Sequence, residues 1–91
     1  MIIHKFVIHP SATYMLNLPY GSEILSVQNQ RETLCAWVRI DDPREQSRIM
    51  HTLRIVMTGD EETYDTTNLR FLGTVQMAQG SLVLHIFEEM Q

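Results

Sequence analysis

Short segments with the alternating pattern of β-strands follow one another along the whole chain, separated by turn-forming residues. In the clearest of them, Leu34, Ala36, Val38 and Ile40 form one face, and Cys35, Trp37 and Arg39 form the other. An apolar face that repeats every second residue is typical of a strand rather than a helix. The predicted strands cover residues 2–8, 14–18, 23–30, 33–40, 49–58, 70–77 and 82–87.

About seven short strands without a convincing long helix predict a mainly β fold, a small antiparallel sandwich or a barrel. Arg31 and Glu32 form a short polar link that favours a tight hairpin, although the link lacks the Asn-Gly pair preferred there. A short helix after Asp42, over residues 42–50, is an alternative to the start of the fifth strand. Pro43 suits a first helical turn behind a capping aspartate, but a strand from Thr52 onward is favoured.

The composition limits the class of protein. The 91 residues predict a single domain over residues 1–91. Eleven acidic and seven basic residues give a net charge of −4, which argues against general affinity for nucleic acids. The single cysteine excludes an internal disulfide, and no apolar run approaches the roughly 20 residues that span a membrane. We therefore expect a cytoplasmic protein without a membrane partner.

No compact catalytic or metal-binding motif is present in the sequence. The four histidines lack the close spacing of a zinc site. Cys35 lies in the middle of a predicted strand, where a free cysteine usually behaves as a small buried apolar residue. There is no glycine-rich phosphate loop and no Gly-x-Ser-x-Gly sequence. We therefore expect a protein that is not an enzyme and needs no metal or cofactor.

Arginine and tryptophan are the residue types that most favour recognition, because both are enriched at binding hot spots. Six of the seven basic residues are arginines, whose planar forks suit phosphate and carboxylate. The candidate ligand-binding residues are Arg39, Arg54, Arg70 and Trp37, with Trp37 as a surface on which a base could stack. The favoured alternative for Trp37 is an anchor of the core, because large aromatic side chains dominate small cores.

The last two predicted strands differ in what they indicate. The segment 82–87 is apolar on both faces, which predicts a central strand or one covered by a partner. A homo-oligomer is therefore expected, since self-association is a common way to cover a second face. In the strand before it, Phe71, Val75 and Met77 are predicted to share one face.

Six segments follow one another along the chain as a set: an N-terminal strand leading to Leu18-Pro19-x-Gly21, Ile24 to Gln28, the Trp37 strand, Leu53 to Gly59, Phe71 to Thr74, and Leu84 to Glu88. Together they resemble a family of short β-rich proteins encoded by bacteriophages and prophages. The resemblance covers nearly the whole chain. It departs from the family pattern at Met57, where a smaller residue is expected.

The resemblance implies a biological setting for the chain, but it assigns no catalytic residues. It implies a non-enzymatic viral accessory protein that acts inside the bacterial host against a defence system. The leading form of this anti-defence hypothesis is nucleotide-binding: arginines in a pocket between subunits sequester a signalling nucleotide. The alternatives are an inhibitor that binds a host defence protein directly, which the net negative charge favours, and a structural or assembly component of the phage particle.

Overall fold

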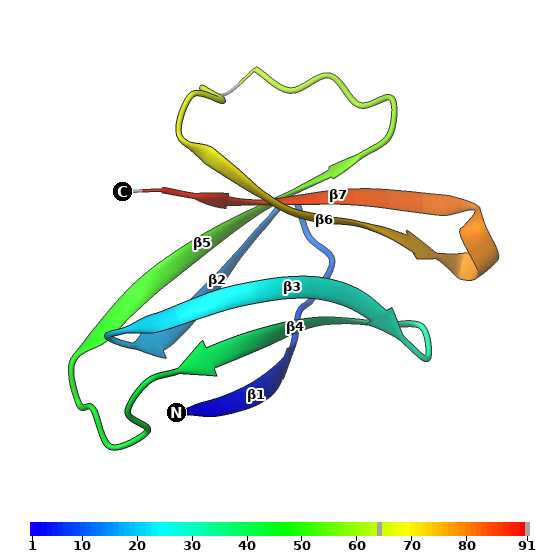
Figure 1. Ribbon diagram of the computed structural model, residues 1–91. Helices are drawn as coiled ribbons and strands as arrows, with labels where there is room; N and C mark the ends of the chain where they lie inside the picture. Colours follow the sequence, from blue (N-terminus) through cyan, green and yellow to red (C-terminus); the bar gives the residue numbers. More distant parts are fainter. Residues whose placement is uncertain (64, 91) are drawn as a thin grey trace.

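Two antiparallel sheets face each other in the computed structural model, which describes residues 1–63 and 65–90 (Figure 1). Within these residues there are seven strands and one short 3-10 helix. Their bounds agree with the predicted segments to within about two residues. The elements are β1 (Ile2–Val7), β2 (Thr13–Pro19), β3 (Ser22–Gln30), β4 (Thr33–Ile40), β5 (Arg48–Met57), β6 (Leu69–Met77), η1 (Ala78–Gly80) and β7 (Leu82–Glu89).

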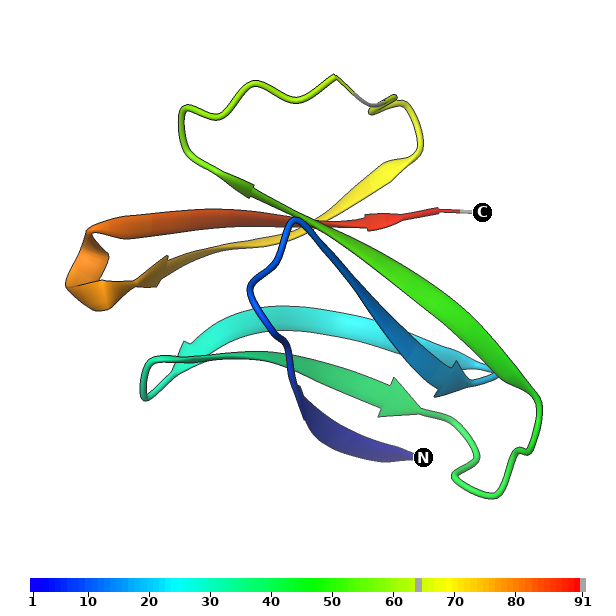
Figure 2. The same ribbon diagram turned by 180° about the vertical axis from the view of Figure 1, so that it is seen from behind.

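The strand order is β1-β4-β3 in one sheet and β2-β5-β7-β6 in the other. The view from behind shows the chain crossing from β1 to β2, and thus from the first sheet to the second (Figure 2). The two sheets remain separate ladders, so the fold is sandwich-like and not a closed barrel. The prediction that residues 82–87 form a central strand is confirmed, because β7 lies between β5 and β6.

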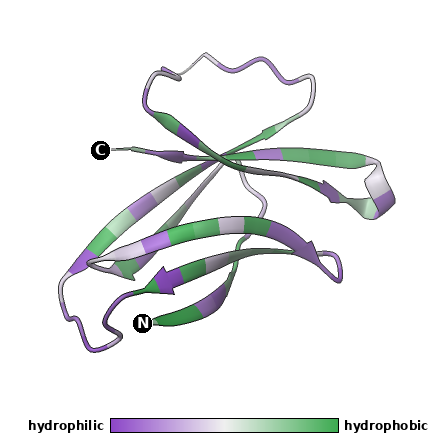
Figure 3. Cartoon of the chain, in the orientation of Figure 1, coloured by the Kyte–Doolittle hydropathy of each residue, from purple (hydrophilic) through white to green (hydrophobic). Residues whose placement is uncertain are grey.

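The core lies between the sheets, where the inward side chains of both meet. Strand periodicity places the apolar face of β4 inward, as predicted, and Cys35 is buried as well. Hydropathy follows the same division, with β7 apolar over most of its length and the loop between β4 and β5 hydrophilic (Figure 3). The core residues are Ile8, Leu16, Leu18, Ile24, Val27, Leu34, Ala36, Val38, Ile40, Leu53, Ile55, Val75, Met77, Leu84 and Ile86.

Side-chain hydrogen bonds join the sheets along β3 and β6. The Asn29 amide donates to the carbonyl of Gln76 at 2.8 Å, and Arg70 donates to the carbonyl of Ile24 at 3.0 Å. These bonds satisfy carbonyl groups on two strands that are both at sheet edges. They fix the relative position of the two sheets on this side of the molecule.

The predicted hairpin between β3 and β4 is confirmed, and its backbone is unusual. Arg31 and Glu32 have φ of 53° and 65°. Positive φ at both central residues defines the turn type that suits the twist of a hairpin, a type that usually contains Asn and Gly. Glu32 is held there by the Asn29 side chain, which accepts a hydrogen bond from the Glu32 N–H at 2.7 Å.

The alternative helix after Asp42 is wrong. Asp42 accepts hydrogen bonds from the N–H groups of Arg44 and Glu45 in a single turn, and β5 begins at Arg48. A side chain that bonds its own backbone in this way favours a turn over a continued helix. Among the described residues, no helix has the length and apolar character needed to cross a membrane.

The prediction that Phe71 shares a face with Val75 and Met77 is also wrong. A bulge lies between Phe71 and Gly73, where the register with β7 shifts by one residue. The extra residue reverses the alternation, so Phe71 is 57% exposed while Val75 is buried. The Phe71 ring instead contacts that of Phe87 on the outer face, with centroids 5.5 Å apart.

Candidate functional site

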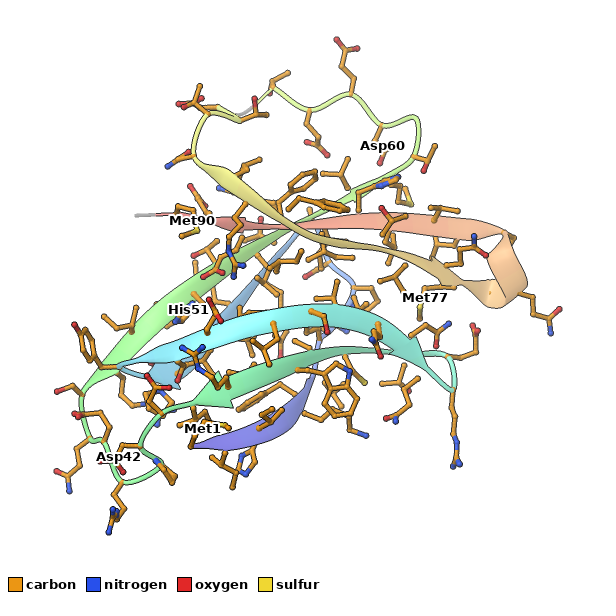
Figure 4. All side chains as sticks on the ribbon, in the orientation of Figure 1. Met1, Asp42, His51, Asp60, Met77 and Met90 are labelled. Atoms are coloured by element: carbon orange, nitrogen blue, oxygen red, sulfur yellow. The ribbon has the colours of Figure 1, made fainter. Side chains whose placement is uncertain are left out.

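A pocket opens beside the beginning of β3, at the end of the molecule where β4 and β7 end. Its volume is about 410 Å³, and a second pocket of about 230 Å³ shares His51, Glu88 and Met90 with it. His51 and Met90 lie on this side of the molecule, opposite the end that contains Met77 (Figure 4). The larger pocket is lined by Gly21, Ser22, Glu23, Arg39, Asp41, His51, Arg70, Glu88 and Met90.

Glu88 is at the centre of the pocket's hydrogen bonds. Its residue exposure is 6%, and among the described residues it is the charged residue that is buried. One carboxylate oxygen accepts a hydrogen bond from Arg70 Nη2 at 2.9 Å, and the other lies 2.6 Å from Nδ1 of His51. An ionised carboxylate only accepts hydrogen bonds, so His51 donates from Nδ1 in this contact. Burial of the charge is thus compensated by two partners.

The strand registers explain why these three side chains meet. Glu88 follows Leu84 and Ile86 at spacings of two, so it lies on the inward face of β7. Arg70 is its direct partner across the ladder on β6. The bulge after Phe71 determines this, because unbroken alternation from Val75 would place Phe71 inward and Arg70 outward.

Arg39 reaches the pocket from the other sheet. It lies on the outer face of β4, opposite Glu23 on β3. Its guanidinium contacts Glu23 at 3.1 Å and Asp41 at 3.0 Å, and all three side chains are at least 38% exposed. Arg39 and Arg70 thus approach the start of β3 from opposite sheets and line one pocket.

The pocket has a mixed charge. Arg39 and Arg70 face the carboxylates of Glu23, Asp41 and Glu88, so acidic groups outnumber guanidinium groups by one. Arginine forks favour an anionic group, whereas carboxylates accept N–H and O–H donors. A ligand that contains both an anionic group and hydrogen-bond donors therefore fits this lining better than a simple anion.

Two of the four predicted binding residues line this pocket, and two do not. Trp37 lies on the outer face of the three-stranded sheet, where its indole donates to Gln28 at 3.1 Å. Arg54 lies on the outer face of the other sheet, 3.2 Å from Glu89 and bonded to Thr13. Arg39 and Arg70 therefore line one pocket, whereas Trp37 and Arg54 do not, although Trp37 shares the outer face of β4 with Arg39.

The favoured prediction that Trp37 anchors the core is wrong. Ala36 and Val38, its neighbours along β4, point into the core and are fully buried. Strand alternation then directs Trp37 outward, where it is only partly buried. It is not among the residues that line the pocket.

A family model for a domain of unknown function, DUF7352, matches residues 1–91. The chain belongs to the DUF7352 family. No curated protein and no solved structure gave a significant match to it.

In this DUF7352 chain the pocket contains one serine hydroxyl group, and among the described residues its hydrogen-bond partner is a backbone carbonyl. The Ser22 hydroxyl donates to the carbonyl of Pro19 at 2.6 Å. A nucleophilic serine needs a base within hydrogen-bond reach. Among the described residues, no group of three or more His, Cys, Asp and Glu is placed to hold a metal ion. In this structure the Ser22 hydroxyl is thus bonded to a backbone carbonyl.

Sequence analysis missed His51 and Glu88 as members of the candidate site. The alternation of Leu84, Ile86 and Glu88 was a usable signal, because it directs Glu88 to the same face as two core residues. A carboxylate on a buried face needs partners. Which residues supply them depends on the pairing of β7 with β5 and β6.

Proposed function

We propose that this chain is a non-enzymatic binding protein that holds a small anionic ligand, with a nucleotide as the leading class, in the pocket beside β3. The observation that supports this proposal is the presence of Arg39 and Arg70, from opposite sheets, in one pocket. Guanidinium groups bind phosphate through paired, charge-assisted hydrogen bonds. The volume of about 410 Å³ is within the usual range for small-molecule sites.

Arg39 can exchange its partners at low cost. Its two ion pairs are with Glu23 and Asp41, whose side chains are 47% and 58% exposed. Exposed ion pairs of this kind contribute about 0–1 kcal/mol. A phosphate can therefore replace the carboxylates at Arg39, which leaves Glu23 and Asp41 to accept hydrogen bonds from the base or sugar of a nucleotide.

Arg70 has a different part in this proposal. Its hydrogen bonds to Glu88 and Ile24 both use Nη2. A guanidinium has five N–H donors in a fixed plane, so Arg70 keeps donors for a ligand while Glu88 holds it in place. In this proposal Arg39 exchanges its carboxylate partners for the ligand, and Arg70 contacts the anionic group of the ligand from a position fixed by Glu88.

The experiment is isothermal titration with cyclic nucleotides, ADP-ribose derivatives and inorganic phosphate. Arg39→Gln is the test variant, and Arg31→Gln, in the β3–β4 turn away from the pocket, makes the same change of charge. We expect a nucleotide to bind more tightly than phosphate. Arg39→Gln should weaken binding about tenfold or more, with Arg31→Gln nearly unchanged. Equal affinities of the two variants would contradict the proposal.

The biological setting we propose is that of a phage accessory protein in the bacterial cytoplasm, where holding the nucleotide keeps it from a defence system. Production of the wild-type chain in bacteria with a nucleotide-signalling defence should then restore phage plating, and Arg39→Gln should not. If no nucleotide binds but plating is still restored, a host protein is the target. Association with virions and no effect on plating would favour a component of the phage particle.

A further inference from the structure

Within the part of the chain that the structure describes, strand β1 leaves one edge of the three-stranded sheet without a neighbouring strand (Figures 1 and 2). The N–H of Ile8 donates to the carbonyl of Leu34 at 2.8 Å, just beyond the β1–β4 ladder. Antiparallel pairing alternates with period two, so residues 2, 4 and 6 direct their backbone groups toward β4. The backbone N–H and C=O groups of Ile3, Lys5 and Val7 therefore point away from the sheet.

Apolar side chains accompany this open edge. Ile3 and Val7 are 52% and 58% exposed on the outer face, and Ile2 is 37% exposed on the inner face. By contrast, two of the three other edge strands, β3 and β6, are joined by the Asn29 and Arg70 hydrogen bonds. An exposed edge with apolar side chains is a template for pairing with another strand.

We propose that β1 pairs antiparallel with β1 of a second copy of this chain, so that two three-stranded sheets become one continuous sheet. In the proposed register, Ile3 lies opposite Lys5 of the second copy, and His4 lies opposite His4. The two-fold axis then passes through the His4 pair. Ile3 and Lys5 are both residues whose backbone groups point outward, so they form the hydrogen-bonded pairs of the new ladder.

Charge repulsion and strand overlap favour this register over the two registers shifted along the strand. A shift that places Lys5 opposite Lys5 would bring like charges together at the centre of the interface, which is destabilising. A shift that places Ile3 opposite Ile3 would leave Val7 outside the overlap. The proposed register has neither fault, and it packs the apolar stem of Lys5 over Ile3 of the second copy.

Self-complementarity is the reason to choose a second copy as the occupant. In this register Ile2 lies opposite Phe6 of the second copy. The two-fold axis produces this pair twice, and in each pair the half-buried Phe6 and the exposed Ile2 cover each other. Every pair is apolar with apolar, apolar with Lys5, or histidine with histidine. An interface related by a two-fold axis uses the same residues on both sides, as β1 does here.

Cysteine cross-linking tests both the interface and the register. In a Cys35→Ser background, His4→Cys places two thiols at a non-hydrogen-bonded pair, whose Cα separation of about 4.5 Å permits a disulfide. Lys5→Cys is the matched control, because residue 5 is adjacent, exposed and opposite Ile3. We expect mild oxidation to convert most His4→Cys chains to covalent dimers and few Lys5→Cys chains.

Three outcomes would overturn the proposal. Equal cross-linking of the two variants indicates random collision, and stronger cross-linking of Lys5→Cys indicates a different register. A wild-type chain that sediments as a monomer at all concentrations indicates that β1 does not pair. Far-UV circular dichroism of each cysteine variant confirms its folding, so that failure to cross-link counts against the interface.

Discussion

Gly73 on β6 lies so close to Val27 on β3 that a Cβ added to it would be 3.1 Å from Cγ2 of Val27 and 3.5 Å from its carbonyl oxygen. Val27 is buried and β-branched, so it has little freedom to move aside. This contact lies on the side where β3 and β6 join the sheets. The absence of a side chain at residue 73 therefore sets how closely the two sheets approach.

The first prediction concerns this approach. Gly73→Ala should lower the free energy of unfolding by about 1–2 kcal/mol, because overpacking outweighs the entropy gained when glycine is replaced. Urea denaturation measures the change. In the Val27→Ala background the same substitution should cost much less, since the clashing methyl group is gone. Equal costs in both backgrounds would show that the contact is not tight.

The second prediction concerns the buried carboxylate. Glu88→Ala should destabilise the chain by about 2–4 kcal/mol, because it removes the partner shared by Arg70 and His51. The neighbouring Glu89 is 38% exposed and pairs with Arg54. Glu89→Ala should therefore cost only about 0–1 kcal/mol in the same denaturation experiment. Similar losses for both variants would contradict a central role of Glu88.

The third prediction concerns the β3–β4 hairpin. Arg31 has a φ of 53°, a conformation that asparagine tolerates better than arginine. Arg31→Asn should raise the free energy of unfolding by about 0.5–1 kcal/mol. Arg44→Asn, in the loop before β5, is the control, because Arg44 is not among the residues with positive φ. A loss of stability in Arg31→Asn would show that the side chain has an unrecognised role.

The fourth prediction is a pH dependence. The Asn29 amide, followed by the N–H of Ala78, lowers the pKa of Glu32 in the folded chain. Because the pKa of Glu32 is lower in the folded chain than in the unfolded chain, its negative charge stabilises the fold at pH values above the unfolded pKa. This contribution is lost as the pH falls through the folded pKa. NMR titration should find the low pKa, and the stability difference between wild type and Glu32→Gln should shrink at acidic pH.

The strands could be predicted from the sequence because alternation is local. In β4, for example, the spacing of Ala36 and Val38 determines which residues point inward, and this alternation does not depend on the other strands. The same spacing directs Trp37 outward. Trp37 thus follows this local pattern and not the general tendency of large aromatic residues to be buried.

The candidate site could be predicted only in part. Arg39 and Arg70 were chosen for their chemistry, but their meeting depends on how two sheets stack and on a bulge after Phe71. A bulge adds one residue without a strong sequence signal, and it reverses which side chains face inward. The Glu88 network depends on strand pairing in the same way, because its partners come from β5 and β6.

Native mass spectrometry of the chain recovered from bacteria with an active nucleotide-signalling defence tests the central proposal most directly. We predict a species with added mass that disappears on denaturation and corresponds to a nucleotide. The same adduct should accompany Arg31→Gln and be lost from Arg39→Gln. A bare chain in all three preparations, or an adduct that Arg39→Gln retains in full, would contradict a nucleotide site beside β3.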